Sequence, residues 1–264
     1  IEELIRHGVD FDRDDSELSF TREGGHKCPR ILHVNGDATG AAIEDALVGS
    51  VWAEDEIAIH EDTFVLDLLT LENTCYGALV WDSAHGLMMI RSKQTVLASG
   101  GLGRVFRETT NPPVATGDGL AMAFRAGAVL QDMEFMQFHP TALYVAGAAR
   151  ALVSESLRGE GAVLKNRHGE RFMPRYHEDA ELAPRDMVSR SIITEMKKKG
   201  ETHVLLDATE MSRSQLESRF PTITGLCDEF ELDVSEEMIP VHPAAHYQIG
   251  GVQTDLMGRT SVGN

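Results

Sequence analysis

Residues 135–161 read F-M-Q-F-H-P-T-A-L-Y-V-A-G-A-A-R-A-L-V-S-E-S-L-R-G-E-G and place histidine, hydroxyl, carboxylate and guanidinium groups in otherwise apolar sequence. His139 precedes Pro140, and a proline biases the residue before it toward an extended or turn conformation. The imidazole is therefore predicted on a fixed, non-helical backbone, which suits a ligand-holding role. A satisfied core histidine is the alternative.

A short helix is predicted immediately downstream, where Ser154, Glu155 and Arg158 stand at i, i+1 and i+4. Glu155 and Arg158 are three residues apart, so on a helix they share a face and their charges would touch. The plain alternative is a surface ion pair, which contributes little to stability. The density of polar groups in residues 135–161 favours a ligand site over a set of unrelated residues.

The composition of the 264 residues is that of a globular protein, with 42% hydrophobic and 25% charged residues. The net charge of −18 argues against nucleic acid or an anionic membrane as partner, because phosphates are bound by clustered Lys and Arg. No apolar run approaches the roughly 18 residues of a membrane helix. Cys28, Cys75 and Cys227 form no C-x-x-C pair, so no disulfide framework is predicted. We therefore expect a soluble, cytoplasmic protein.

Glycine-containing turns are further candidates for ligand contact. Asp37 or Thr39 is predicted to cap a helix after such a turn, and a helix N-terminus suits an anion. A buried strand over 95–99 is predicted to end at Gly100-Gly101, where a ligand or another backbone can approach closely. A tight turn without a ligand is the alternative. Asp118 opens another helix as its N-cap, which we favour, or as a ligand hydrogen-bonder.

The regular elements mix strands and helices. A strand at 57–60 is predicted to lead into a three-stranded antiparallel meander, with turns at 72–73 and 83–86. Helices are predicted at 211–219 and 224–232. The clearest helix covers 184–200, with proline in its first turn and lysines in its last. Arg185 is anomalous there, because a cation at a helix N-terminus opposes the macrodipole, so another group should hold it.

His242 and His246 have the i, i+4 spacing of zinc-binding helices, but Pro243 lies between them and no H-E-x-x-H acid is present. No metal site is therefore predicted. The chain also lacks a P-loop, a G-x-S-x-G elbow and a complete G-x-G-x-x-G fingerprint.

Nine motifs in order resemble the succinate dehydrogenase/fumarate reductase flavoprotein family: T-R-E-G-G-H, D-A-T-G, V-L-A-S-G-G, T-T-N-P, T-G-D-G, E-F-M-Q-F-H-P-T, S-E-S-L-R-G-E-G, L-A-P-R-D-M-V-S-R and P-A-A-H-Y-Q-I-G-G. The resemblance spans nearly the whole chain. It implies an α/β fold in which an FAD-binding, Rossmann-like domain is interrupted by an α+β capping domain. The FAD domain would take residues 1–135 and 249–264, and the cap 136–248.

The resemblance also implies roles for single residues. The positions expected to contact FAD are Thr39, Gly40, Ala98, Ser99, Gly100, Gly101 and Asp118. His139 and Ser154 would hold one carboxylate of a C4 dicarboxylate. His246 would help to hold the other, and Glu23 would meet a substrate ammonium. Arg185 would transfer a proton that Glu155 and Arg158 supply.

The nearest members of the family oxidise L-aspartate to iminoaspartate with oxygen or fumarate as acceptor, on the route to quinolinate and NAD. Transfer of iminoaspartate to a quinolinate synthase is implied. A fumarate reductase or succinate dehydrogenase flavoprotein, with Glu23 as the discriminating residue, is one alternative. A non-catalytic relic without flavin is another. Because the chain lacks the glycine fingerprint and a later clamp arginine, and both ends interrupt a pattern, we expect an internal segment that is inactive alone.

Overall fold

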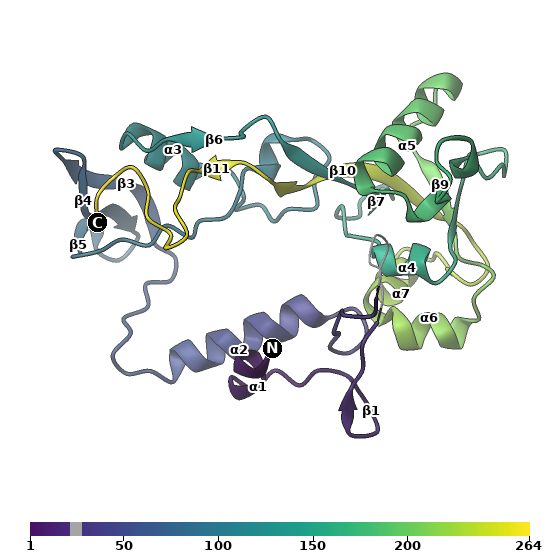
Figure 1. Ribbon diagram of the computed structural model, residues 1–264, viewed down its shortest axis with the longest axis horizontal. Coiled ribbons are helices and arrows are strands. Elements are labelled where there is room, and N and C mark those ends of the chain that lie inside the picture. Colours follow the sequence, from purple (N-terminus) through teal and green to yellow (C-terminus); the bar gives the residue numbers. More distant parts are fainter. Residues whose placement is uncertain (22–27) are drawn as a thin grey trace. The chain divides into compact units, whose positions relative to one another are not determined.

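The computed structural model describes residues 1–21 and 28–264, which form two compact units. Unit 1 comprises Ile1–Ile57 and Phe138–Ala244, and unit 2 comprises Ala58–Gln137 and Ala245–Asn264. Helices and strands occur in both, so the predicted mixed α/β class is confirmed (Figure 1). No helix within the described residues is both long and apolar enough to cross a membrane.

Unit 1 is built on a four-stranded sheet of order β7-β10-β9-β8. The strands are β7 (Met136–Leu143), β8 (Val163–Lys165), β9 (Val204–Asp207) and β10 (Ile239–Gln248). β9 pairs antiparallel with both of its neighbours, with Ile239 opposite Leu206 and Val163 opposite Asp207. His139 therefore stands on a sheet strand, as the proline after it predicts.

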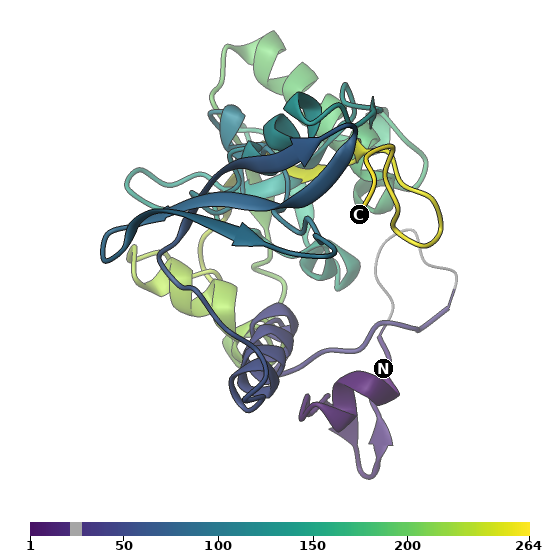
Figure 2. The ribbon, with the colours of Figure 1, turned by 90° about the vertical axis from the view of Figure 1, so that its left-hand side faces the viewer.

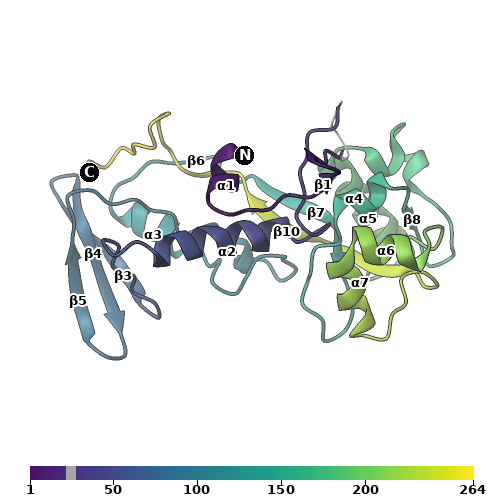
Figure 3. The same cartoon turned by 90° about the horizontal axis from the view of Figure 1, so that it is seen from below.

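Helices complete the core of unit 1. They are α4 (Glu155–Gly159), α5 (Arg185–Lys199), α6 (Arg213–Arg219) and α7 (Pro221–Asp228), joined by the 3₁₀ turns η2 (Met173–Arg175) and η3 (Ala180–Leu182). Figure 3 shows these helices gathered at one end of the view. Leu157, Ile192, Leu216 and Cys227, one from each helix, share a single buried cluster with strand residues such as Leu206. This cluster fixes where α4 and the start of α5 lie relative to the sheet.

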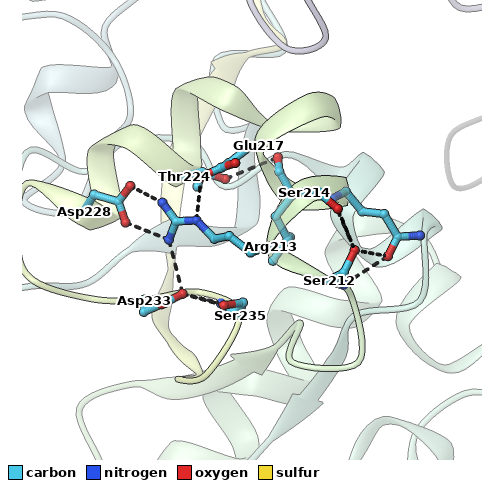
Figure 4. Close-up of polar contacts among 10 residues, drawn as sticks. Ser212, Arg213, Ser214, Glu217, Thr224, Asp228, Asp233 and Ser235 are labelled. Carbon is cyan, nitrogen blue, oxygen red and sulfur yellow. Dashed lines mark hydrogen bonds and ion pairs between the residues drawn. The ribbon is translucent and has the colours of Figure 1, made fainter.

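Arg213 ties α6 to α7 and to the loop that follows (Figure 4). Its guanidinium contacts Glu217 at 2.8 Å, Asp228 at 2.5 Å and Asp233 at 3.2 Å. These carboxylates raise the Arg213 pKa, with the Asp228 hydrogen bond as the largest cause. α6 itself begins with a capping box at Ser212. The cluster is fully engaged with its own chain and serves the fold.

The N-terminal part of unit 1 has a small core of its own. It contains α1 (Glu2–Arg6), the hairpin β1 (Arg13–Asp14) and β2 (Glu17–Leu18), and α2 (Thr39–Trp52). Val9, Phe11 and Val34 are its buried residues. The predicted N-caps of α2 are wrong: the N-cap is Ala38, without a side-chain cap, and Thr39 is the first helical residue.

Unit 2 contains the predicted meander, β3 (Phe64–Leu71), β4 (Thr74–Asp82) and β5 (Gly86–Arg91), which Figure 2 shows as long antiparallel ribbons. It also holds the 3₁₀ turn η1 (Gly103–Val105), α3 (Asp118–Arg125) and the pair β6 (Leu130–Gln131) and β11 (Gly251–Val252). The strands predicted at 57–60 and 95–99 are wrong. No described segment pairs with either, and Val96 is 90% exposed.

Candidate functional site

His139 is fully buried on β7, and the chain folds back beside it. Its Nδ1 accepts a hydrogen bond from the Thr141 backbone N–H at 3.3 Å. In a neutral ring this places the proton on Nε2. The Thr141 hydroxyl donates to the Val153 carbonyl, and the Val153 N–H donates to the Thr141 carbonyl, each at 2.9 Å. That bridge returns the chain antiparallel to β7, so Ser154 follows directly beyond it.

Ser154 is the N-cap of α4, and its hydroxyl accepts from the Ser156 N–H at 3.2 Å. The predicted short helix and the contact between Glu155 and Arg158 are both confirmed, with 3.2 Å between the guanidinium and a carboxylate oxygen. The other Glu155 oxygen accepts from Nε and an Nη of Arg185, each at 2.8 Å. One carboxylate thus joins two guanidinium groups.

This arrangement explains the cation at the start of α5. Arg185 is the first residue of the helix, where the macrodipole disfavours it, and Glu155 holds it there. The expectation that another group restrains Arg185 is therefore confirmed. The Arg185 side chain remains 30% exposed, whereas the Arg158 side chain is completely buried.

Burial lowers the Arg158 pKa, and this is the largest influence on it. Glu155 opposes the shift by its charge and hydrogen bond, and the positive charge of Arg185 adds to it. A guanidinium with a lowered pKa gives up a proton more readily than an ordinary one. The three side chains form a continuous polar path from a fully buried guanidinium to a partly exposed one.

His246 lies on the part of β10 that belongs to unit 2. Its Nδ1 is 2.9 Å from the Thr110 hydroxyl, and its carbonyl accepts from the Asn111 amide at 2.7 Å. The Thr110 N–H also donates to the Ala245 carbonyl at 3.0 Å. Thr110 and Asn111 were not predicted as functional residues. The T-T-N-P motif that contains them was the available signal, but nothing in it indicates contact with a histidine 136 positions later.

The turn that contains Ala98, Ser99, Gly100 and Gly101 is packed against the start of α3 in unit 2. A Cβ on Gly119 would lie 1.7 Å from the Ser99 hydroxyl oxygen, so this approach requires glycine. Ala98, Ser99 and Gly100 are exposed, and Gly100 has a φ of +73° with open space beside it. α3 has no side-chain cap. Backbone N–H groups at a helix N-terminus suit a phosphate-bearing cofactor.

Two predicted helix caps differ in the structure. Asp118 is not the N-cap of α3, because Gly117 takes that position and the Asp118 carboxylate accepts from Thr116 at 2.6 Å. Asp37 does not cap α2. Its carboxylate accepts from two N–H groups at the start of α7, those of Thr222 at 3.1 Å and Ile223 at 3.3 Å. Both carboxylates satisfy donors that local sequence does not identify.

Thr39 and Gly40 line a cavity of about 670 Å³ in unit 1. Ser154 lines the same cavity, together with the hydroxyl of Thr21 and the ring of His33, which lie 2.7 Å apart. The structure thus brings two predicted cofactor positions and one predicted substrate position to one space. Glu23 lies outside the described residues. Among the described residues no cluster of three or more metal-ligating side chains occurs.

The family model described as an FAD binding domain matches residues 1–264. The chain therefore belongs to the FAD binding domain family, the class of flavoproteins whose cofactor is FAD.

L-aspartate oxidase 1 of Ralstonia nicotianae is 50% identical over 272 residues, covering 99% of this chain and 51% of that protein. The chloroplastic L-aspartate oxidase of Arabidopsis thaliana is 46% identical, over 99% of this chain and 42% of its own length. The chain thus spans about half the length of these relatives.

Solved structures give the same family. A quinol-fumarate reductase with menaquinol molecules matches with a TM-score of 0.91 and 32% identity, over 99% of this chain and 48% of that one. The Mycobacterium smegmatis Sdh1 complex with UQ1 matches with a TM-score of 0.75 and 34% identity, over 96% and 45%. The expected resemblance to the succinate dehydrogenase/fumarate reductase flavoproteins is confirmed.

Proposed function

We propose that the complete protein is an FAD-dependent L-aspartate oxidase and that a dicarboxylate reacts beside the Arg158–Glu155–Arg185 cluster. The observation that carries this proposal is Glu155, a nearly buried carboxylate that binds two guanidinium groups. Two cations against one anion leave an excess positive charge, which suits an anionic substrate. The L-aspartate oxidases at 43% to 50% identity support the choice of substrate.

The substrate carboxylates would be held by imidazole and hydroxyl donors. His139, with its proton on Nε2, and Ser154 would bind one carboxylate, and His246 would help to bind the other. Fixed donors of this kind restrict the substrate to one orientation, which accounts for a large part of catalytic acceleration. Thr39, Gly40, Asp118 and the turn that contains Ala98 and Gly101 would contact FAD.

Oxidation of L-aspartate removes a hydride from Cα and releases a proton from the ammonium nitrogen to water, which leaves iminoaspartate as its protonated imine. FAD, when bound, supplies the hydride acceptor and passes the electrons to oxygen or fumarate. An arginine with an ordinary pKa above about 12 is a poor base. In this direction Arg185 would act through its charge. When fumarate is reduced, a carbon must gain a proton, and Arg185 would donate it and recover one from Arg158 through Glu155.

The first test compares hydrogen peroxide release by the complete protein with L-aspartate and with succinate. Faster release with L-aspartate is expected. A protein that purifies without a flavin absorption spectrum would instead indicate a non-catalytic relic of the fold. Peroxide release with succinate alone would refute the proposal and favour the fumarate reductase class.

The second test concerns Arg185. We expect Arg185→Leu to retain bound flavin and to lose about 10² to 10³ in turnover, the typical effect of removing one group that stabilises transition-state charge. Arg190→Leu is the matched control, because Arg190 lies on the same helix, is 78% exposed and has its nearest carboxylate, Asp186, at 3.7 Å. Near wild-type fumarate reduction by the Arg185 variant would refute its role.

The runner-up function is a fumarate reductase or succinate dehydrogenase flavoprotein, which the TM-score of 0.91 to a quinol-fumarate reductase favours. Aspartate carries an ammonium that succinate lacks, so an acceptor such as Glu23 should discriminate between them. Losing a desolvated contact between carboxylate and ammonium costs about 2–5 kcal/mol. Glu23→Gln should therefore lower kcat/KM for L-aspartate and leave the turnover of fumarate unchanged. Parallel loss of both activities would favour the runner-up.

The domain ranges belong to the same proposal. Residues 136–248 would form the cap, with 1–135 and 249–264 in the FAD domain. We also propose that the protein is cytoplasmic, which the wide spacing of Cys28, Cys75 and Cys227 in this chain favours. Its imine product is unstable in water, so direct transfer to a quinolinate synthase would protect it.

A further inference from the structure

Glu181 is a buried acid on the 3₁₀ turn η3, and it is not among the residues predicted to have a functional role. One carboxylate oxygen accepts from the Leu164 backbone N–H and from Nε of Arg171, both at 3.1 Å. The other accepts from an Nη of Arg171 at 2.6 Å. The side chain therefore fastens η3 to β8 with charge-assisted hydrogen bonds, which are stronger than neutral ones.

The backbone of the same residue holds Arg158. The Glu181 carbonyl accepts a short hydrogen bond from an Nη of Arg158. The fully buried guanidinium is thus held between the Glu155 carboxylate on α4 and this carbonyl on η3. Three residues separate Glu181 from Arg185 along the chain, so η3 also sets where α5 begins.

We propose that Glu181 is a positioning residue for the proton path through Arg158, Glu155 and Arg185, an inference that rests on the function proposed above. Its carboxylate fixes the turn whose carbonyl holds Arg158. It also places a second negative charge near a buried cation that would otherwise share one carboxylate with Arg185.

Three elements packed against Arg158 each place one charged residue near its guanidinium. Glu155 lies on α4, Arg185 on α5 and Glu181 on η3. Burial lowers the Arg158 pKa most, and the charges of Glu155 and Glu181 act in the opposite sense. Removing the Glu181 charge should therefore lower that pKa further. The protonated guanidinium needed for fumarate reduction would then be lost at a lower pH.

The chain offers a matched control in Glu195. Its side chain is 2% exposed against 4% for Glu181, and each acid pairs with a half-exposed arginine, Arg175 at 3.0 Å and Arg171 at 2.6 Å. Glu195 lies inside α5 and contacts neither Arg158 nor Arg185 in any hydrogen bond or ion pair of the described residues. Glu181→Gln and Glu195→Gln should therefore lower the melting temperature similarly.

Of these two glutamine variants, only Glu181→Gln should change the kinetics of the complete flavoprotein. We expect kcat for fumarate reduction to fall about tenfold, with KM unchanged within twofold. The alkaline limb of the kcat–pH profile should move to lower pH by about one unit, since one pH unit is a tenfold change in protonation. Arg171→Gln leaves the Glu181 charge less compensated, so the limb should move upward. Glu181→Asp should restore part of kcat.

Identical pH profiles in wild type, Glu181→Gln and Arg171→Gln would overturn the proposal and leave Glu181 with a role in stability alone. If Glu181→Gln does not fold, the upward shift of the pH profile in Arg171→Gln decides whether Glu181 positions Arg158.

If the wild-type protein turns over neither L-aspartate nor fumarate, the proposed function fails. Exchange of the Arg158 guanidinium protons, followed by ¹⁵N NMR, then decides the positioning role: it should accelerate at least about tenfold in Glu181→Gln and not in Glu195→Gln.

Discussion

Replacing Thr110 with valine removes one hydroxyl and tests how His246 is oriented. Valine keeps the branched shape and the backbone N–H that donates to Ala245 at 3.0 Å. The hydroxyl lies 2.9 Å from the Nδ1 of His246. The proposed contact with a substrate carboxylate requires the ring proton on Nε2, and in that tautomer the Thr110 hydroxyl donates to Nδ1.

The expected size of the effect follows from that single contact. A neutral hydrogen bond contributes about 1 ± 0.5 kcal/mol, so its loss should weaken dicarboxylate binding about fivefold, within about two- to thirteenfold. The loss should appear in KM for L-aspartate and in the Kd of succinate, measured from changes in the flavin absorption spectrum. Thr110→Ser retains the hydroxyl and should remain close to wild type. Wild-type binding by Thr110→Val, or equal losses in both variants, would refute the reasoning.

Three further predictions concern stability, followed by thermal unfolding. Ala180 has a φ of +47°, so Ala180→Gly should raise stability by about 0.5–1 kcal/mol, and a lower melting temperature would contradict this. Asp37→Ala should cost about 1–2 kcal/mol, because the start of α7 loses its acceptor, whereas the exposed Glu44→Ala should be neutral. Burial raises the Asp207 pKa, but donors including Lys165 outweigh it and hold the pKa below its usual value. The resulting stability is present above about pH 4 and is lost as the pH falls through the lower folded pKa. Asp207→Asn should therefore make the melting temperature depend less on pH at acid pH.

Local signals in the sequence predicted the elements that local physics determines. The helix α5 was predicted from the proline before it, the glycine after it and the lysines in its last turn. Gly200 indeed has a φ of +66°. The three-residue spacing of Glu155 and Arg158 predicted their contact, and the misplaced charge of Arg185 predicted a partner. In each case the deciding residues lie within one element or its immediate ends.

Features that depend on distant residues could not be predicted in this way. Asp37 caps a helix 185 positions later, so its sequence neighbours indicated the wrong helix. Residues 95–99 have the apolar, β-branched composition of a buried strand, but a strand also needs a partner, and none lies within the described residues. Thr110 contacts His246 and Glu181 contacts Arg158 only through the tertiary fold. Neither Thr110 nor Glu181 lies in a sequence pattern whose chemistry predicts that contact.

The unequal burial of the two arginines determines where the excess charge of the cluster lies. Glu155 can neutralise one guanidinium, and the fully buried Arg158 has the greater need of it, because an uncompensated buried charge costs several kcal/mol. Arg158 also donates a hydrogen bond to the Glu181 carbonyl. Arg185 shares Glu155 through two contacts at 2.8 Å but is 30% exposed, so water can compensate its charge and the unneutralised charge is least costly there. A dicarboxylate would therefore be attracted to Arg185, and Arg158 would remain behind it as the store of protons.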